Sequence, residues 1–361
     1  MIKSEARLNF TTGTTRAVLL AVLAITITCS AIFLDLSSVN SISIQGKEFL
    51  ESGAATWELT NKNTISPVRC DNLSKIDGIL HSGAISEENM TITPISMPGT
   101  SIPVNTVSQD FYKLLDLTSL DLSTPGIFIP TVISERLGIR AGDSFLTKSG
   151  EIFVSGVYNY PDDGRQGSLG FAALAPLDER ASPNRLLDSC QATIWGQNDS
   201  LKTMLWTALE SKEESANSRV KPEIAQLNGK FGITFEGVKL YDSRDTKYLG
   251  VLVLLVCTLL GFVFIRIRRL EIASWLHVSM KKSDALKISL LEIAPIIFLA
   301  LITSIPTFLF AYIGADSSDT LTYIFLAARI FLASAIGLLF GTTLGIVATK
   351  ERHLFKYFKE R

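Results

Sequence analysis

The sequence has very few residues of the kinds that build catalytic or metal centres. It contains three histidines and four cysteines, and none of them stands at the spacing of a metal-binding cluster. No glycine-rich loop ends in Lys-Ser or Lys-Thr, so the chain lacks a phosphate-binding loop of its own. No serine occupies a Gly-x-Ser-x-Gly nucleophile elbow. We therefore expect neither an enzyme nor a cofactor in this chain.

Charged residues are also scarce for a soluble protein. They make up 19% of the chain, against about a quarter in typical soluble domains, while hydrophobic residues make up 47%. The formal net charge of −1 hides a basic segment at residues 349–361. This balance predicts a membrane protein, and we expect no nucleic-acid partner.

Four apolar segments are long enough to cross a bilayer as helices, which takes about 20 residues. They are residues 17–35, 248–265, 288–313 and 321–348. The predicted segments around them are an N-terminal segment (1–16), a large domain (36–247), a coupling segment (266–287), a short loop (314–320) and a tail (349–361).

Basic residues indicate the direction of these helices, because Lys and Arg are enriched in cytoplasmic loops. They precede the first helix, lie between the second and third, and follow the fourth, whereas residues 314–320 contain none. We therefore predict a multi-pass protein of the bacterial cell (inner) membrane, with both termini cytoplasmic and residues 36–247 extracytoplasmic. In the alternative, the first helix is a cleaved signal peptide, but its apolar run is long and no clear small-x-small site follows it.

The large domain mixes short alternating strands with amphipathic helices, which predicts an α+β fold. Residues 70–80 are predicted to form a short helix capped by Asp71, and residues 199–214 a longer amphipathic one. In an exported domain Cys70 and Cys190 can form a disulfide; the alternative is that both are free and buried. Cys29 and Cys257 lie in apolar segments, where a thiol is usually a small buried hydrophobe.

Several motifs, taken in order, resemble one transporter family. The segment RRLEIASWLHVSMKKSDALKISLLE, from Arg268 to Glu292, follows the second membrane helix. Further motifs are Ile76-Asp77-Gly78 and residues 108–117 and 129–143 of the large domain. Together with the topology, they resemble the permease subunits of MacB/FtsX-type (type VII) ABC transporters, which include MacB, LolC and LolE. Ser279 and Met280 stand where the family usually has a Gly-Ala break.

The resemblance implies a fold, partners and a function. The membrane part would be α-helical, and the extracytoplasmic α+β domain would contain a porter-like and a β-rich subdomain. A separate cytoplasmic ABC ATPase would bind ATP and Mg, and a second permease chain would complete a homodimer or heterodimer. By mechanotransmission, such complexes export a hydrophobic or amphipathic substrate, in contact with membrane lipid. The alternative is an FtsX-like relay that activates an extracytoplasmic partner such as a cell-wall hydrolase.

The resemblance also assigns the coupling to the ATPase to the segment that begins at Arg268. Ile272, Trp275 and Leu276 are expected to fill a groove on the ATPase, with charged residues at its rim. The assigned coupling residues are Arg268, Arg269, Glu271, Ile272, Trp275, Leu276, Lys281 and Lys282. In the alternative, the basic residues only anchor the helix to anionic headgroups.

Two charged residues fall within predicted membrane helices. Glu292 is expected to pair with a basic residue of the coupling segment, in a structural role. Arg329 either faces the interior of the permease pair and binds an anionic group, or snorkels outward near Asp316 and Asp319. The residues alone leave both alternatives open.

Overall fold

A computed structural model describes residues 17–115, 117, 126–165, 167–178, 184–196, 200–210, 221–313 and 319–350. The chain divides into two units. One contains Met1–Ile44 and Gly237–Arg361, and we call it the helical bundle. The other contains Gln45–Glu236, and we call it the α+β domain.

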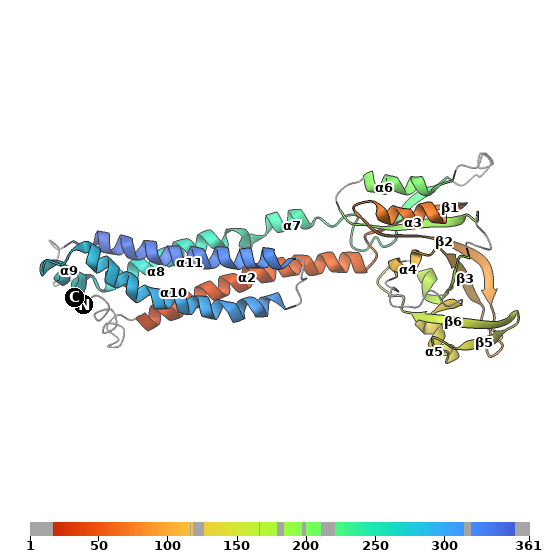
Figure 1. The fold of residues 1–361 in the computed structure, drawn as a ribbon, viewed down its shortest axis with the longest axis horizontal. Coiled ribbons are helices and arrows are strands. Elements are labelled where there is room, and N and C mark those ends of the chain that lie inside the picture. Colours follow the sequence, from red (N-terminus) through yellow and green to blue (C-terminus); the bar gives the residue numbers. More distant parts are fainter. Residues whose placement is uncertain are drawn as a thin grey trace. The chain divides into compact units, whose positions relative to one another are not determined.

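In the described part of the bundle, four helices are long and apolar enough to cross a membrane, as predicted. They are α2 (Ala17–Glu51), α8 (Leu249–Ile267), which follows the turn η5 (Asp245–Tyr248), α10 (Lys282–Tyr312) and α11 (Thr320–Ala348) (Figure 1). Two shorter helices, α7 (Gly237–Ser243) and α9 (Arg269–His277), complete the described bundle. The α+β domain lies between the first two long helices, which confirms the predicted fold class.

Helix α2 is much longer than its apolar core. It continues to Glu51, past the end of the apolar segment at residue 35, because no proline follows and apolar residues recur. Leu36 and Val39 still belong to the bundle core. The bundle and the α+β domain therefore share one continuous helix.

Helices α8 and α11 pack closely because α11 carries a glycine at every fourth position. These are Gly337, Gly341 and Gly345. A methyl group on Gly341 would collide with the backbone of Thr258 in α8, and one on Gly337 would lie 2.6 Å from a carbonyl oxygen of α8. Small residues let helices approach this closely in a membrane, where packing drives their association.

The α+β domain contains a nine-stranded sheet within the described residues, in the order β5-β6-β4-β7-β3-β2-β8-β1-β9. Its strands are β1 (Thr56–Ile65), β2 (Ile79–Ile92), β3 (Ile102–Val107), β4 (Ile127–Pro130), β5 (Ser144–Thr147), β6 (Gly150–Tyr158), β7 (Ala173–Pro176), β8 (Leu187–Ile194) and β9 (Glu223–Gln226). The accompanying helices and turns are α3 (Pro67–Asn72), η1 (Leu73–Lys75), α4 (Phe111–Leu114), α5 (Thr131–Leu137), η2 (Gly167–Phe171), α6 (Ser200–Met204) and η3 (Leu205–Ala208).

Two helix predictions in this domain need correction. The helix predicted at residues 70–80 is α3, which begins at Pro67 after Ser66, because proline is favoured in the first turn of a helix. Asp71 is therefore inside the helix and does not cap it. The helix predicted at residues 199–214 is split into α6 and η3, and residues 211–220 lie outside the described part.

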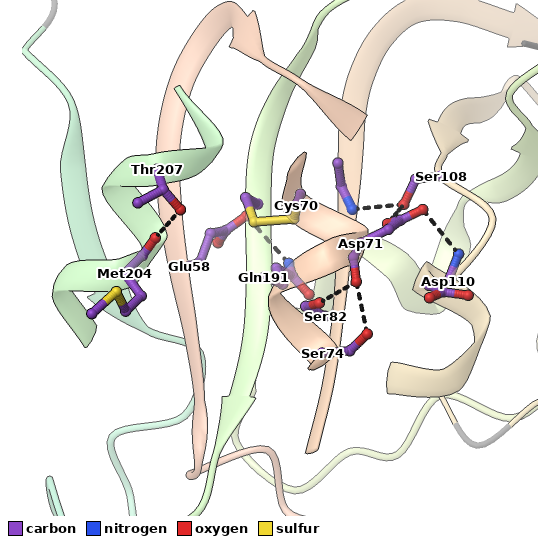
Figure 2. The surroundings of a disulfide bond; sticks show 12 residues. Glu58, Cys70, Asp71, Ser74, Ser82, Ser108, Asp110, Gln191, Met204 and Thr207 are labelled. Atoms are coloured by element: carbon purple, nitrogen blue, oxygen red, sulfur yellow. Dashed lines mark hydrogen bonds between the residues drawn. A yellow bond between two sulfur atoms is a disulfide. The ribbon is translucent and has the colours of Figure 1, made fainter. Parts of the chain in front are cut away.

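Cys70 of α3 and Cys190 of β8 are joined by a disulfide (Figure 2). Both residues are fully buried, and the bond spans 120 residues of sequence. In the chain-entropy account, a cross-link of this span stabilises the fold by about 4–5 kcal/mol. Beside it, the Asp71 carboxylate accepts hydrogen bonds from the Ser108 hydroxyl at 2.5 Å and from the Asp110 backbone at 3.4 Å. This network fixes α3 against the start of α4.

Candidate coupling site

Helix α9 is short, and both of its ends are fixed by identifiable interactions. At its start, the chain turns at Arg268 directly out of α8, with no intervening loop. At its end, the Met280 N–H donates to the Trp275 carbonyl at 3.1 Å and the Ser279 N–H to the Leu276 carbonyl at 3.2 Å. This is a Schellman motif, and it requires a left-handed residue, here Ser279 with φ of 69°. Ser279 therefore occupies a conformation that favours glycine.

The Arg268 guanidinium connects three helices. It donates to both Glu271 carboxylate oxygens, at 2.9 and 2.8 Å, in the forked geometry that suits arginine. It also forms an ion pair with Glu292, which lies on α10. The structure thus pairs Glu292 with a basic residue of the coupling segment.

Burial makes this ion pair important for the position of α9. The side chains of Arg268 and Glu292 are 3% and 0% exposed. Burial alone would lower the pKa of Arg268, but the hydrogen bonds and charges of Glu271 and Glu292 raise it above its ordinary value. The guanidinium therefore stays charged, and its charge is satisfied only while α8, α9 and α10 keep this arrangement.

The apolar side chains of α9 face the bundle, which differs from the sequence-based expectation. Ile272 is fully buried and Leu276 is 9% exposed, so neither is available to fill a groove on another protein. Trp275 is half-buried against the bundle core, and its ring lies 5.7 Å from the Arg268 guanidinium carbon. The sequence pattern correctly indicates an apolar face, but that face packs within the chain itself.

The exposed surface of this segment lies at the end of α9 and the start of α10. Val278 is 82% exposed, the largest exposed fraction among the large hydrophobic residues of the described chain. Around it, Ser274, His277, Lys281 and Lys282 are also exposed. This surface combines one exposed apolar side chain with basic groups. The interactions of Arg268 connect it to α8 and α10.

Arg329 lies inside the bundle and pairs with a residue that the sequence analysis missed. Its guanidinium donates to the Asp35 carboxylate at 2.8 Å, and Asp35 is fully buried. The arginine side chain passes over Gly250, where a methyl group would lie 3.6 Å away. Residues of α11, α2 and α8 thus meet at this point, at the opposite end of the bundle from α9. Of the residues expected nearby, Asp316 lies outside the described part.

A signal for Asp35 was present in the sequence. It is the first acidic residue after an apolar run of α2, and a charge there favours a partner within the bundle. Asp35 is the last residue of the predicted first membrane helix, residues 17–35, and the sequence analysis gave it no partner. The continuation of α2 through this position is what places it in the bundle core.

The chain is similar to known proteins over part of its length. No protein-family model and no curated protein matches it. Among solved structures, it is similar to the periplasmic region of MacB from Actinobacillus actinomycetemcomitans, at 12% identity and a TM-score of 0.36, over 49% of this chain and 91% of that one. It is also similar to the extracellular domain of the noncanonic ABC-type transporter YknZ from Gram-positive bacteria, at 15% identity and a TM-score of 0.30, over 48% of this chain and 100% of that one.

Proposed function

We propose that the chain is the permease subunit of an ABC complex, driven by a separate cytoplasmic ATPase that binds ATP and Mg. The observation that carries this proposal is the geometry of α9. A buried ion pair of Arg268 with Glu292 and a partly exposed one with Glu271 fix α9 between α8 and α10, and α9 ends in an exposed surface around Val278. If the basic residues only anchored the helix to anionic lipid headgroups, they would have to be exposed. That role would not require Arg268 to be buried and paired with two carboxylates.

The orientation belongs to the same proposal. The basic segments favour a cytoplasmic position for α9 and both termini. The Cys70–Cys190 disulfide supports an extracytoplasmic α+β domain, because disulfides persist in oxidising compartments. In this orientation the surface around Val278 faces the cytoplasm, where the ATPase would bind.

The proposed mechanism uses rigid helices to transmit motion. When the ATPase closes on ATP, α9 moves with it, and Arg268 transfers the displacement to α8 and α10. Close packing through Gly341 transfers it from α8 to α11, and Arg329 transfers it to α2 at Asp35. Because α2 continues without a break to Glu51, it carries the motion into the α+β domain. A pair of permease chains would use this motion to export a hydrophobic or amphipathic substrate from the outer face of the membrane.

The direct test is purification of the tagged chain from its native membrane in mild detergents, followed by mass spectrometry of the proteins and small molecules that accompany it. We expect an ABC ATPase at near-equal stoichiometry. Substitution of Val278→Glu should remove the ATPase, whereas Leu146→Glu, at an exposed apolar position of the α+β domain, should not.

The result also distinguishes export from the alternative of a relay. A co-purifying amphipathic molecule that stimulates ATP hydrolysis supports export. A stable soluble hydrolase bound to the α+β domain supports the relay instead. A chain that is recovered without an ATPase in every detergent would contradict both.

A further inference from the structure

The α+β domain contains a large groove over one face of its sheet, and the coupling function does not use it. The groove has a volume of about 690 Å³, within the range of about 300–1,000 Å³ that is usual for ligand sites. Its floor is formed by the neighbouring strands β3, β2, β8, β1 and β9. The segment from Tyr160 to Ala172 contributes further lining residues.

The strand register shows that this face is distinct from the hydrophobic core. Glu58 of β1 lies opposite Gln191 of β8, and Thr60 lies opposite Ser189 and Glu223. Side chains alternate along a strand, so these residues share one face. The residues between them, such as Leu59 and Cys190, point to the other face and pack with α3 and η3. The groove is therefore a second, polar face of the same five strands.

The lining is strongly acidic. Glu223, Glu58 and Glu87 come from β9, β1 and β2, and these strands and β8 are neighbours in the sheet. Asp188 of β8 also borders the groove, but its carboxylate accepts hydrogen bonds from the Ser86 hydroxyl at 2.5 Å and from the Asn63 N–H at 2.9 Å. Among the described residues, Lys62 is the only basic one that lines the groove. Within the described residues, none of the four carboxylates forms an ion pair. Strands are spaced by about 4.8 Å, so the carboxylates are distributed over roughly 14 Å.

The floor of the groove also contains polar side chains that have no hydrogen-bond partner in the described part of the chain. Asn105 is 4% exposed and Ser189 is 6% exposed, and both line the groove. Neither side chain forms a hydrogen bond with the part of the chain that the structure describes. Their polar atoms are not closed off from solvent, so in the described part of the chain they are open to water or to a molecule in the groove. Gln191 donates to Glu58 at 3.2 Å and orients that carboxylate (Figure 2).

Apolar groups complete the lining. Ile85, Leu169 and Ala172 are buried, and Tyr160 contributes an aromatic ring. Burial raises the pKa of the Tyr160 phenol to about 12. The charge of Arg165 lowers this pKa, and the carboxylates of Asp163 and Glu58 raise it. Its phenol is therefore neutral and adds no further negative charge. A ligand that matches this surface carries several positive charges and apolar groups side by side.

We propose that the groove binds a cationic amphipathic peptide. An extended peptide rises about 3.3 Å per residue, so a stretch of roughly four or five residues spans the three glutamates. A compact divalent cation is a poorer match, because the described residues contain no group of three or more His, Cys, Asp or Glu side chains that could hold a metal. The assignment deepens the proposed function, since it names a substrate class, but the binding itself requires no ATPase.

The test uses the full chain in nanodiscs of uncharged phosphatidylcholine and a fluorescein-labelled synthetic peptide of alternating lysine and leucine. We expect saturable binding that weakens with salt, and no binding of the matched glutamate and leucine peptide. The double variant Glu58→Gln/Glu223→Gln should bind about tenfold more weakly, because two facing charges are lost. The control Asp77→Asn/Glu135→Gln removes the same charge from exposed positions outside the groove and should change binding by less than about twofold.

A third variant acts in the opposite direction. Lys62→Gln removes a positive charge from the groove lining, so it should strengthen binding, which a misfolded domain would not do. Equal affinity of the native chain and the Glu58→Gln/Glu223→Gln variant would overturn the assignment. Equal binding of the lysine and glutamate peptides, or no binding of either, would also overturn it. Co-purification of the ATPase should be unchanged in all of these variants, so failure of the groove and failure of the coupling proposal give different results.

Discussion

Arg268 is a buried charge whose carboxylate partners come from two different helices, Glu271 from α9 and Glu292 from α10. Removing one member of such a cluster is costly, because the remaining charge stays buried without compensation. The same residue positions α9, so stability and coupling depend on it together.

We predict that Arg268→Ala lowers the free energy of unfolding by about 3–5 kcal/mol, because the fully buried Glu292 then loses its ion pair with Arg268. Thermal unfolding of the purified chain in detergent measures the effect. Lys281→Ala is the matched control, since Lys281 is exposed in the same segment, and it should leave the unfolding temperature nearly unchanged. Similar unfolding temperatures for the two variants would contradict the role given to Arg268.

Ser279 gives a prediction of the opposite sign. Its left-handed backbone disfavours any residue with a Cβ atom, so Ser279→Gly should raise stability by about 1 kcal/mol. The control Ser274→Gly places glycine inside α9 and should lower stability by about 1 kcal/mol. The difference between the two unfolding temperatures is the measurement, and a Ser279→Gly variant less stable than the native chain would refute the Schellman geometry.

At the residue scale, the sequence predicts which residues need a partner better than it predicts which way their side chains face. It indicates that Glu292 needs a basic partner, since an intramembrane carboxylate is costly alone. It does not indicate whether Ile272 and Leu276 face inward or outward, because an apolar stripe on a short helix fits a core and an interface equally well. The Asp35–Arg329 pair joins residues 294 positions apart, and no local pattern connects them.

At the scale of secondary-structure elements, α8 and α11 pack with their backbones close together at Gly337 and Gly341. Gly341→Ala should destabilise the bundle by about 1–3 kcal/mol, because the new methyl group meets the Thr258 backbone, which cannot rotate away. Gly250→Ala is the control, since its methyl group would meet only ordinary contacts at 3.6 Å or more. Equal effects of the two substitutions on thermal unfolding would show that α8 and α11 do not approach this closely.

Element types and boundaries are predicted to different degrees. The four long helices follow from the length of their apolar runs. The predicted first helix ends at residue 35, because the continuous apolar run stops there, whereas α2 extends to Glu51. The packing of Leu36 and Val39 in the bundle core is a tertiary contact that the local sequence does not predict. The groove was missed because its carboxylates are far apart in sequence and meet only through strand pairing.

At the scale of the whole molecule, the proposed function depends on which side of the membrane each part occupies. A cysteine introduced at exposed Glu135 of the α+β domain should react with a membrane-impermeant maleimide in intact cells. A cysteine at Ser274 of α9 should react only after the cells are permeabilised. Cys70 and Cys190 are bonded and Cys257 is buried, so they give little background. The other free cysteine, Cys29, is only partly buried and is replaced by serine in these variants. The reverse pattern of labelling would invert the proposed topology.

The central claim is that the surface around Val278 contacts an ABC ATPase. The most direct measurement places a photo-cross-linking amino acid at Val278, irradiates cells that contain the full chain, and identifies the captured protein by mass spectrometry. A second probe at Val251, which is 59% exposed on α8 and far from α9 in sequence, serves as the control. We predict that an ATPase with a phosphate-binding loop is captured from Val278 and not from Val251. If Val278 captures no such ATPase, or if both positions capture the same proteins, the coupling role of α9 is wrong.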